Sequence, residues 1–466
     1  MTIRSENASL ERRRRPIDKI SVRVPANGYF SAAFVGAFFG ALAMYLEQWP
    51  AAYVILAISW AVIPLLAMTD RIVFNGKRLY RTGIIAMASA YLTNKRFWLK
   101  PIDIEQAETT AIPTFKRGGR VFIRYQTVVR GKEVEFSFSS GGRNYRKFVR
   151  ELFSRISEEV LDAVSIELRD YAGEPRQVRA RAKQSQIPAS DVLESAFKIS
   201  KVRTLHGKAA AEDISYASSA ERAITLRQLG NELRVSGSFL QALESFRRAA
   251  IIRPDDAWLL FDFARCMQAF AGTQADVRLE RRAAALMRLA ERRAGNDGHL
   301  LAMLGESYSQ FGEWERARNA FRKATDAVGE HFRSIRGMAE IALRDGKLAH
   351  VVHNFGAAGR LAESPAARRW SNAEADYFMR LSSDEEYLEM ELGRVNLLDT
   401  LDRWRRISLK LAIACLPIIG LGVFYDDPTT ANLGWGFSGS MLLIWGLFRM
   451  GRRVFAPRIS PELLDG

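Results

Sequence analysis

Few side chains in this sequence are placed where they could carry out chemistry. His350 and His353 are three residues apart and would share one face of a helix, but a metal site needs further ligands that do not follow at a suitable spacing. The acidic run that begins at Asp384 suits the start of a helix better than a pair of catalytic carboxylates. The sequence has no GxxxxGK[ST], HExxH, GxSxG or CxxC motif. It therefore predicts no catalytic residue, no metal site and no cofactor, and we expect no enzyme.

An apolar pattern recurs in the middle of the chain with the period of paired helices. Its first copy consists of Leu226, Leu229, Gly230, Leu233, Ala242, Phe246, Ala249 and Pro254. Its second strong copy consists of Leu301, Leu304, Gly305, Tyr308, Ala317, Phe321 and Ala324. Large residues at i, i+3, i+4 and i+7 form one apolar stripe, and small residues let the partner helix approach. Because one helix pair cannot bury both of its faces, neighbouring pairs are expected to stack.

This pattern resembles the tetratricopeptide repeat (TPR), a helix–turn–helix of about 34 residues. Two weaker copies are in phase with it, at residues 260–290, where 272–280 is expected to be an insertion, and at 335–358. Residues 366–381 would begin a fifth unit or a capping helix. We assign residues 220–400 to the repeats, which implies an α-helical solenoid that binds proteins. An ordinary helical bundle is the alternative.

The TPR resemblance also implies a peptide-binding groove that is lined by first-helix positions. In this sequence those positions are Arg227, Asn231, Arg234, Arg265, Arg333, Arg336 and Arg344. Such a groove would favour an acidic peptide or a C-terminal carboxylate. Arg227 and Asn231 match the places where chaperone-binding members hold a carboxylate, whereas Asp262, His299 and Met303 depart from that pattern. The alternative is that these arginines are only a solvated face.

Apolar runs flank the soluble part at residues 29–46, 51–68, 407–424 and 433–448. Because each approaches the ~17–20 residues that cross a bilayer as a helix, we assign transmembrane hairpins to 29–68 and 405–449. Lysine and arginine flank both hairpins but are missing from their short loops. The positive-inside rule therefore places the soluble domains, the basic N-terminal segment (1–28) and the C-terminal tail (450–466) in the cytoplasm. Because arginine greatly outnumbers lysine, as in proteins of GC-rich bacteria, we expect a bacterial inner membrane. Buried hairpins in a soluble protein are the alternative.

A GxxxG motif, Gly36 and Gly40, lies in the first apolar run. It would serve packing within the hairpin or self-association through transmembrane helices.

Residues 70–168 are expected to form a small antiparallel β domain. Asn75–Gly76 is a turn between two strands, residues 121–129 and 134–138 alternate as a hairpin, and a helix over 144–168 would cap the sheet. This order resembles bacterial pleckstrin-homology-like (PH-like) domains. Residues 83–93 depart from it by being apolar, and are expected to be a buried strand or to lie against the membrane. The glycines at 141 and 142 are expected to form a plain turn.

Residues 169–219 are expected to be a basic linker with one helix near 191–198. Its basic stretch, 176–183, would contact lipid head groups or be solvated. The formal net charge of +16 has a membrane explanation in the residues that flank the hairpins, so no nucleic-acid partner is predicted.

Together these patterns predict a mixed membrane protein with a TPR solenoid, a small helix-capped β domain and four transmembrane helices. Its predicted function is that of an inner-membrane scaffold or adaptor, which recruits protein partners, acidic peptides in particular. The alternative is a lipid-responsive or lipid-handling protein of envelope biogenesis that acts through the PH-like domain and the basic linker.

Overall fold

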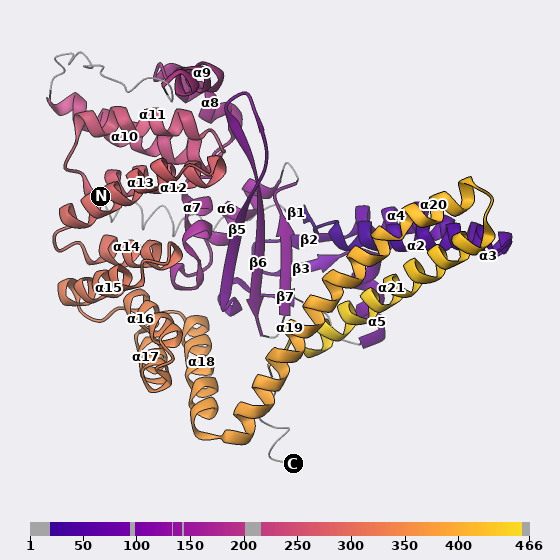
Figure 1. Ribbon diagram of the computed structural model, residues 1–466. Coiled ribbons are helices and arrows are strands. Elements are labelled where there is room, and N and C mark those ends of the chain that lie inside the picture. The colour runs from indigo at the N-terminus through magenta and orange to yellow at the C-terminus, as the bar shows by residue number, and fades with distance from the viewer. Residues whose placement is uncertain (1–18, 94–97, 133, 142–143, 201–215, 459–466) are drawn as a thin grey trace. The chain divides into compact units, whose positions relative to one another are not determined.

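The computed structural model describes residues 19–93, 98–132, 134–141, 144–200 and 216–458. The chain divides into two compact units (Figure 1). The soluble unit comprises Met1–Pro25 and Asp70–Ala375, and the hairpin unit comprises Ala26–Thr69 and Asp376–Gly466. The arginines at 12–15 that precede the first hairpin lie outside the described residues, as does most of the C-terminal tail.

Two antiparallel sheets begin the soluble unit. The first has the order β1 (Ile20–Arg23), β2 (Arg71–Phe74), β3 (Leu79–Thr82) and β4 (Trp98–Leu99), and the second the order β5 (Gln106–Arg117), β6 (Arg120–Gly131) and β7 (Val134–Ser139). The predicted turn after β2 is confirmed, because the Asn75 side chain accepts the backbone N–H groups of Lys77 and Arg78. Strand β1 comes from the basic N-terminal segment and pairs with β2. The first hairpin is therefore inserted in the sequence between two paired strands of this sheet.

The predicted continuous helix over 144–168 is wrong. The structure has α6 (Tyr145–Phe153), a single 3₁₀ turn (Glu158–Val160) and α7 (Ala163–Tyr171) in its place. The break is stabilised at Asp162, whose carboxylate accepts the backbone N–H of Ser165 at 3.0 Å and of Thr109 at 3.2 Å. Since Thr109 lies on β5, this residue both caps α7 and fixes it to the sheet.

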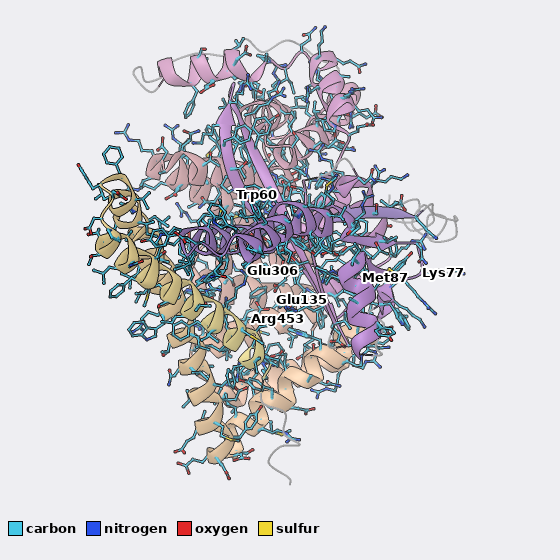
Figure 2. All side chains as sticks on the ribbon, turned by 90° about the vertical axis from the view of Figure 1, so that its right-hand side faces the viewer. Trp60, Lys77, Met87, Glu135, Glu306 and Arg453 are labelled. Atoms are coloured by element: carbon cyan, nitrogen blue, oxygen red, sulfur yellow. The ribbon has the colours of Figure 1, made fainter. Side chains whose placement is uncertain are left out.

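The buried strand that was one expectation for the apolar segment after β3 is also wrong, because this segment is a helix, α5 (Ile84–Thr93). Alanine, methionine and leucine favour helix over strand, which explains the difference. Met87 on this helix is 74% exposed (Figure 2). The expected basic linker is largely helical as well, with α8 (Pro175–Gln184) and α9 (Ser190–Ser200). Val178 and Ala182 of α8 are buried against the first repeat, so this stretch packs as an element of the fold.

Paired antiparallel helices form the rest of the soluble unit (Figure 1). The pairs are α10 (Tyr216–Val235) with α11 (Phe239–Ile252), α12 (Ala257–Gln274) with α13 (Val277–Arg293), α14 (Gly298–Gln310) with α15 (Trp314–Val328), and α16 (Phe332–Arg344) with α17 (Leu348–Leu361), and α18 (Pro365–Ser383) follows. A Cβ atom at Gly230 would lie 2.8 Å from the ring of Phe246, and one at Gly305 would lie 2.6 Å from the ring of Phe321. The prediction of a TPR-like helical solenoid is therefore confirmed. The insertion expected at 272–280 instead extends α12 and starts α13.

The hairpin unit contains α2 (Asn27–Tyr45), a helix over Trp49–Thr69 with a π-helical turn at Ile58–Val62, α19 (Glu385–Ala414), α20 (Leu416–Phe424) and α21 (Pro428–Phe455). Gly36 and Gly40 allow close packing within the first hairpin, because added Cβ atoms would meet Ser59 and Leu56. Trp60 is 72% exposed (Figure 2).

Among the described residues, three helices are long and apolar enough to cross a membrane: Asn27–Tyr45, Trp49–Thr69 and Glu385–Phe424. The expectation of four such helices is therefore wrong. Helix α21, which contains the expected fourth span, includes Gly434, Gly436 and Ser438, whose small side chains lower its mean hydropathy.

Candidate protein-interaction face

The first helices of the repeats present a set of arginines that we call the arginine face: Arg227, Arg234, Arg265, Arg333 and Arg336. Residues 158–171, which run from the 3₁₀ turn through α7, lie along this face and are called the acidic segment. In the soluble unit α7 contacts both β5 and α10 (Figure 1). Six of the seven predicted groove residues, all except Arg344, are contacted by carboxylates of the same chain.

Arg227 and Asn231 converge on one carboxylate, that of Asp262 on α12. The Arg227 Nε atom lies 2.6 Å from Asp262 Oδ2, and Asn231 Nδ2 donates to the same oxygen at 2.8 Å. Both donors come from α10, so the three side chains tie the first repeat to the second. The TPR resemblance assigned Arg227 and Asn231 to positions that hold a carboxylate. Both do hold one, and it belongs to α12 of the same chain.

Glu167 of the acidic segment joins the arginines of the first two repeats. Its Oε2 atom accepts a hydrogen bond from Arg234 Nη1 at 2.7 Å, and its Oε1 atom pairs with Arg265. The Glu167 and Arg234 residues are 8% and 7% exposed. Burial would lower the pKa of Arg234, but the charges of Glu167 and Asp262 outweigh burial and raise it. This part of the arginine face is thus a closed, neutralised contact.

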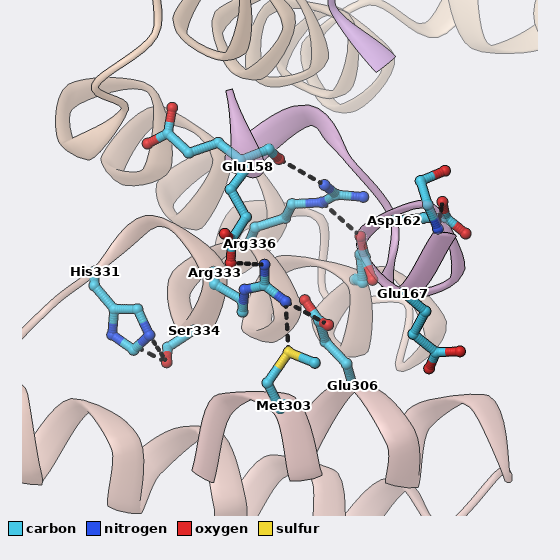
Figure 3. A network of polar contacts seen from close by, with 12 residues as sticks. Glu158, Asp162, Glu167, Met303, Glu306, His331, Arg333, Ser334 and Arg336 are labelled. Atoms are coloured by element: carbon cyan, nitrogen blue, oxygen red, sulfur yellow. Dashed lines mark hydrogen bonds and ion pairs between the residues drawn. The ribbon is translucent and has the colours of Figure 1, made fainter. Parts of the chain in front are cut away.

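Arg333 performs the equivalent role in the last two repeats, where it lies between two acids (Figure 3). Its Nη1 atom lies 2.9 Å from Glu306 Oε2, and its Nη2 atom lies 3.4 Å from Glu158 Oε1. Burial would raise the pKa of Glu158, but the charges of Arg169 and Arg333 outweigh burial and hold it below its usual value. Glu158 therefore stays ionised on the arginine face.

Glu159 contacts the end of the array in a way that the sequence reasoning missed. Its two carboxylate oxygens accept the backbone N–H groups of Glu363 and Ser364, each at 2.9 Å, just before α18. Its own carbonyl accepts from Arg336 Nη1 at 3.5 Å. Free N–H groups at a helix start favour an anion, so Glu159 acts as a cap supplied from a distant segment. The only feature of the sequence that could have indicated this contact is the pair of adjacent glutamates at 158 and 159.

A cavity of about 350 Å³ remains beside these contacts. It is lined by Glu158, Glu159, Leu161, His299, Glu306, Glu330, His331, Phe332, Arg333, Arg336, Leu361 and Glu363. The ring of His331 contacts the hydroxyl of Ser334 (Figure 3), with Nε2 and Oγ 3.0 Å apart, and burial lowers the pKa of His331. Because the cavity borders both Arg333 and Arg336, this end of the arginine face has room for another group.

Arg344, the remaining predicted groove residue, stacks its guanidinium over the Trp314 ring with 4.3 Å to the ring centroid. The residues that the sequence predicts to be structural in the repeats are buried in the core of the helical array, except Pro254, which is exposed. Those buried are Leu226, Gly230, Leu233, Ala242, Phe246, Ala249, Gly305, Tyr308, Ala317, Phe321 and Ala324. Within the described residues no three His, Cys, Asp or Glu side chains are grouped as metal ligands would be.

Comparisons with known proteins give distant structural similarity. No protein-family model matches the sequence, and no curated protein matches it. The structure titled "Crystal structure of MamA" has a TM-score of 0.25 and 13% identity, with 44% of this chain and 96% of that chain covered. The pilF structure of Pseudomonas aeruginosa has a TM-score of 0.31 and 20% identity, with 50% of this chain and 99% of that chain covered. The APC/C hetero-tetramer Cut9-Hcn1 has a TM-score of 0.30 and 13% identity, with 65% of this chain and 51% of that chain covered. These similarities are too distant to transfer any residue or partner to this chain.

Proposed function

We propose that this protein is a non-enzymatic scaffold of a bacterial inner membrane, which recruits protein partners to its TPR-like array. The three apolar helices Asn27–Tyr45, Trp49–Thr69 and Glu385–Phe424 would anchor it. The lysines and arginines that flank these helices favour an orientation with the soluble unit in the cytoplasm.

The single observation that carries this proposal is that the arginine face binds carboxylates of its own chain at several points. Glu167 pairs with Arg234 and Arg265 of the first two repeats, and Glu158 pairs with Arg333 of the fourth. Beside this face, the carboxylate of Glu159 accepts backbone N–H groups at the start of α18. A surface that binds an acidic segment in cis has the charge and donor geometry to bind an acidic peptide of a partner.

The two ends of the arginine face differ in how accessible they are. At the N-terminal end the side chains of Glu167 and Arg234 are 10% and 8% exposed. At the other end the side chain of Arg333 is 13% exposed, but those of Arg336 and Glu158 are 27% and 41% exposed. Helix α7 is also held by the core, because Leu168 is 1% exposed. We therefore assign partner binding to the end that holds Arg333 and Arg336, where an acidic peptide would replace Glu158 and Glu159.

We further propose that the two small sheets and α6 form a PH-like domain. Its role in the scaffold is to supply the acidic segment, which follows α6 directly and occupies the arginine face until a partner replaces part of it.

Cross-linking and affinity capture from native membranes tests the scaffold proposal. We expect an Arg333→Gln/Arg336→Gln variant to lose partners that the wild type captures, and a Glu158→Gln/Glu159→Gln variant to capture more of them. The matched control is Arg282→Gln/Arg322→Gln, which removes two exposed arginines elsewhere on the array. An identical set of partners in all four proteins would contradict the proposal.

A further inference from the structure

A second cavity lies among the end of β7, the start of α6 and the start of α8. Its volume is about 930 Å³, within the range of pockets that hold small organic ligands. Its basic lining residues are Arg146, Lys147, Arg150, Arg176 and Arg179. Among the described residues of the lining, Glu174 alone is acidic. The cavity is therefore strongly electropositive.

The cations of this cavity differ from those of the arginine face, because no carboxylate in the part of the chain that the structure describes pairs with them. Arg146 donates from Nη1 to the carbonyl of Gly173 at 2.9 Å, and none of the five cations forms an ion pair with a carboxylate that the structure describes. Burial lowers the pKa of Arg146, and the like charge of Arg179 adds to this effect against the opposing influence of Tyr125. Arg146 is partly buried, whereas Lys147, Arg150, Arg176 and Arg179 are exposed. A partly buried guanidinium usually has an anion beside it, so the position of Arg146 in this basic cavity points to an anionic ligand.

The start of α6 supplies further donors to the same cavity. Asn144 occupies the N-cap position but makes no side-chain cap, since its Nδ2 atom donates instead to the carbonyl of Ser21 at 3.4 Å. Asn144 and Tyr145 both line the cavity. The first N–H groups of a helix have no partner within the helix and favour an anion in front of them.

We propose that this cavity binds an organic anion that carries at least two phosphate groups. The planar guanidinium fork matches a phosphate group, and α6 adds backbone donors. With five basic residues against one acidic residue in the described lining, one carboxylate would neutralise only a fraction of the charge. A soluble polyphosphate and a lipid head group with two phosphates offer the same chemistry. This site is independent of partner binding at the arginine face.

Titration of the full-length protein in dodecyl maltoside micelles with inositol hexakisphosphate tests the site, followed by competition with micelles that contain cardiolipin or phosphatidylcholine. The test variant is Arg150→Gln/Arg179→Gln, which replaces two exposed cations of the cavity. Its matched control is Lys183→Gln/Arg322→Gln, which removes the same charge from exposed positions outside the lining. Circular dichroism checks that both variants fold as the wild type does.

We expect the wild type to bind inositol hexakisphosphate saturably and the control variant to bind it with the same affinity. The affinity of Arg150→Gln/Arg179→Gln should be about 100-fold weaker, at roughly tenfold for each charge-assisted hydrogen bond lost. Displacement by cardiolipin but not by phosphatidylcholine would identify a lipid head group as the ligand. Binding that cardiolipin leaves unchanged would identify a soluble polyphosphate. Absence of saturable binding to either probe, or an equal loss in the control, would overturn the proposal.

Discussion

Replacing Glu167 by glutamine is predicted to destabilise the soluble unit strongly. Each carboxylate oxygen of Glu167 faces one guanidinium: Oε2 lies 2.7 Å from Arg234 Nη1, and Oε1 pairs with Arg265. The side chains of Arg234 and Arg265 are 8% and 11% exposed. Glutamine keeps the size of the side chain but removes the charge, so two largely buried cations would lose their shared anion.

The expected loss is about 3–5 kcal/mol, the usual cost of breaking a buried ion pair from one side. Asn231 limits the loss, because its Oδ1 atom still accepts from Arg234 Nη2 at 3.0 Å. For a domain of 150–250 residues such a change lowers Tm by roughly 6–20 °C, and the lowering is smaller in a larger unit such as this one.

Thermal unfolding of the full-length protein in detergent micelles, followed by tryptophan fluorescence, measures this change. The matched control is Glu315→Gln, because the side chain of Glu315 is 80% exposed and pairs with Arg318 on the same helix. An exposed pair of this kind contributes less than about 1 kcal/mol. If the two variants unfolded at the same temperature, the assignment of Glu167 as a buried anchor between the sheet domain and the repeats would be refuted.

Three further predictions concern packing, pH and orientation. Gly230→Ala should destabilise the array by about 1–3 kcal/mol in denaturant unfolding, because its Cβ atom would lie 2.8 Å from the Phe246 ring. Gly272→Ala is the control and should not destabilise the array, because its Cβ atom would meet nothing within 4 Å. Equal losses of stability in the two variants would contradict the packing argument. Because the pKa of Glu158 is held below its ordinary 4.5, this residue stabilises the fold above that pH, and the stabilisation is lost as the pH falls through the lowered value. The Tm difference between wild type and Glu158→Gln should therefore shrink on acidification, and a difference that does not change with pH would count against the ion pair. In spheroplasts, an impermeant maleimide should label Gln48→Cys from outside and Lys347→Cys only after permeabilisation; the reverse would contradict the proposed orientation.

Local spacing predicted the helix pairs because their packing depends on residues that are close in sequence. Gly230 and Phe246 are only one helix apart, and their types already indicate that a ring packs against a bare backbone. The turn at Asn75 was predicted for the same reason, since its side chain bonds to N–H groups two and three residues on.

The ion pairs of the candidate site were not predictable, since they join residues that are far apart in sequence. Glu167 and Arg234 are separated by 67 residues, and Glu158 and Arg333 by 175. Periodicity placed the arginines on one face, but it contained no information about which distant carboxylates would reach them. The four-residue strand β1 was missed for a related reason, because its pairing with β2 spans the whole first hairpin.

The most direct test of the proposed binding face is the affinity of a fluorescein-labelled peptide with the sequence of residues 156–162, ISEEVLD, for the purified full-length protein. We expect it to bind the Glu158→Gln/Glu159→Gln variant roughly tenfold more tightly than wild type, because the internal competitor is weakened. Binding should be lost in Arg333→Gln/Arg336→Gln, and a control peptide ISQQVLD should not bind. Equal affinity of ISEEVLD for all three proteins would contradict the claim that this end of the arginine face is the site for an acidic partner.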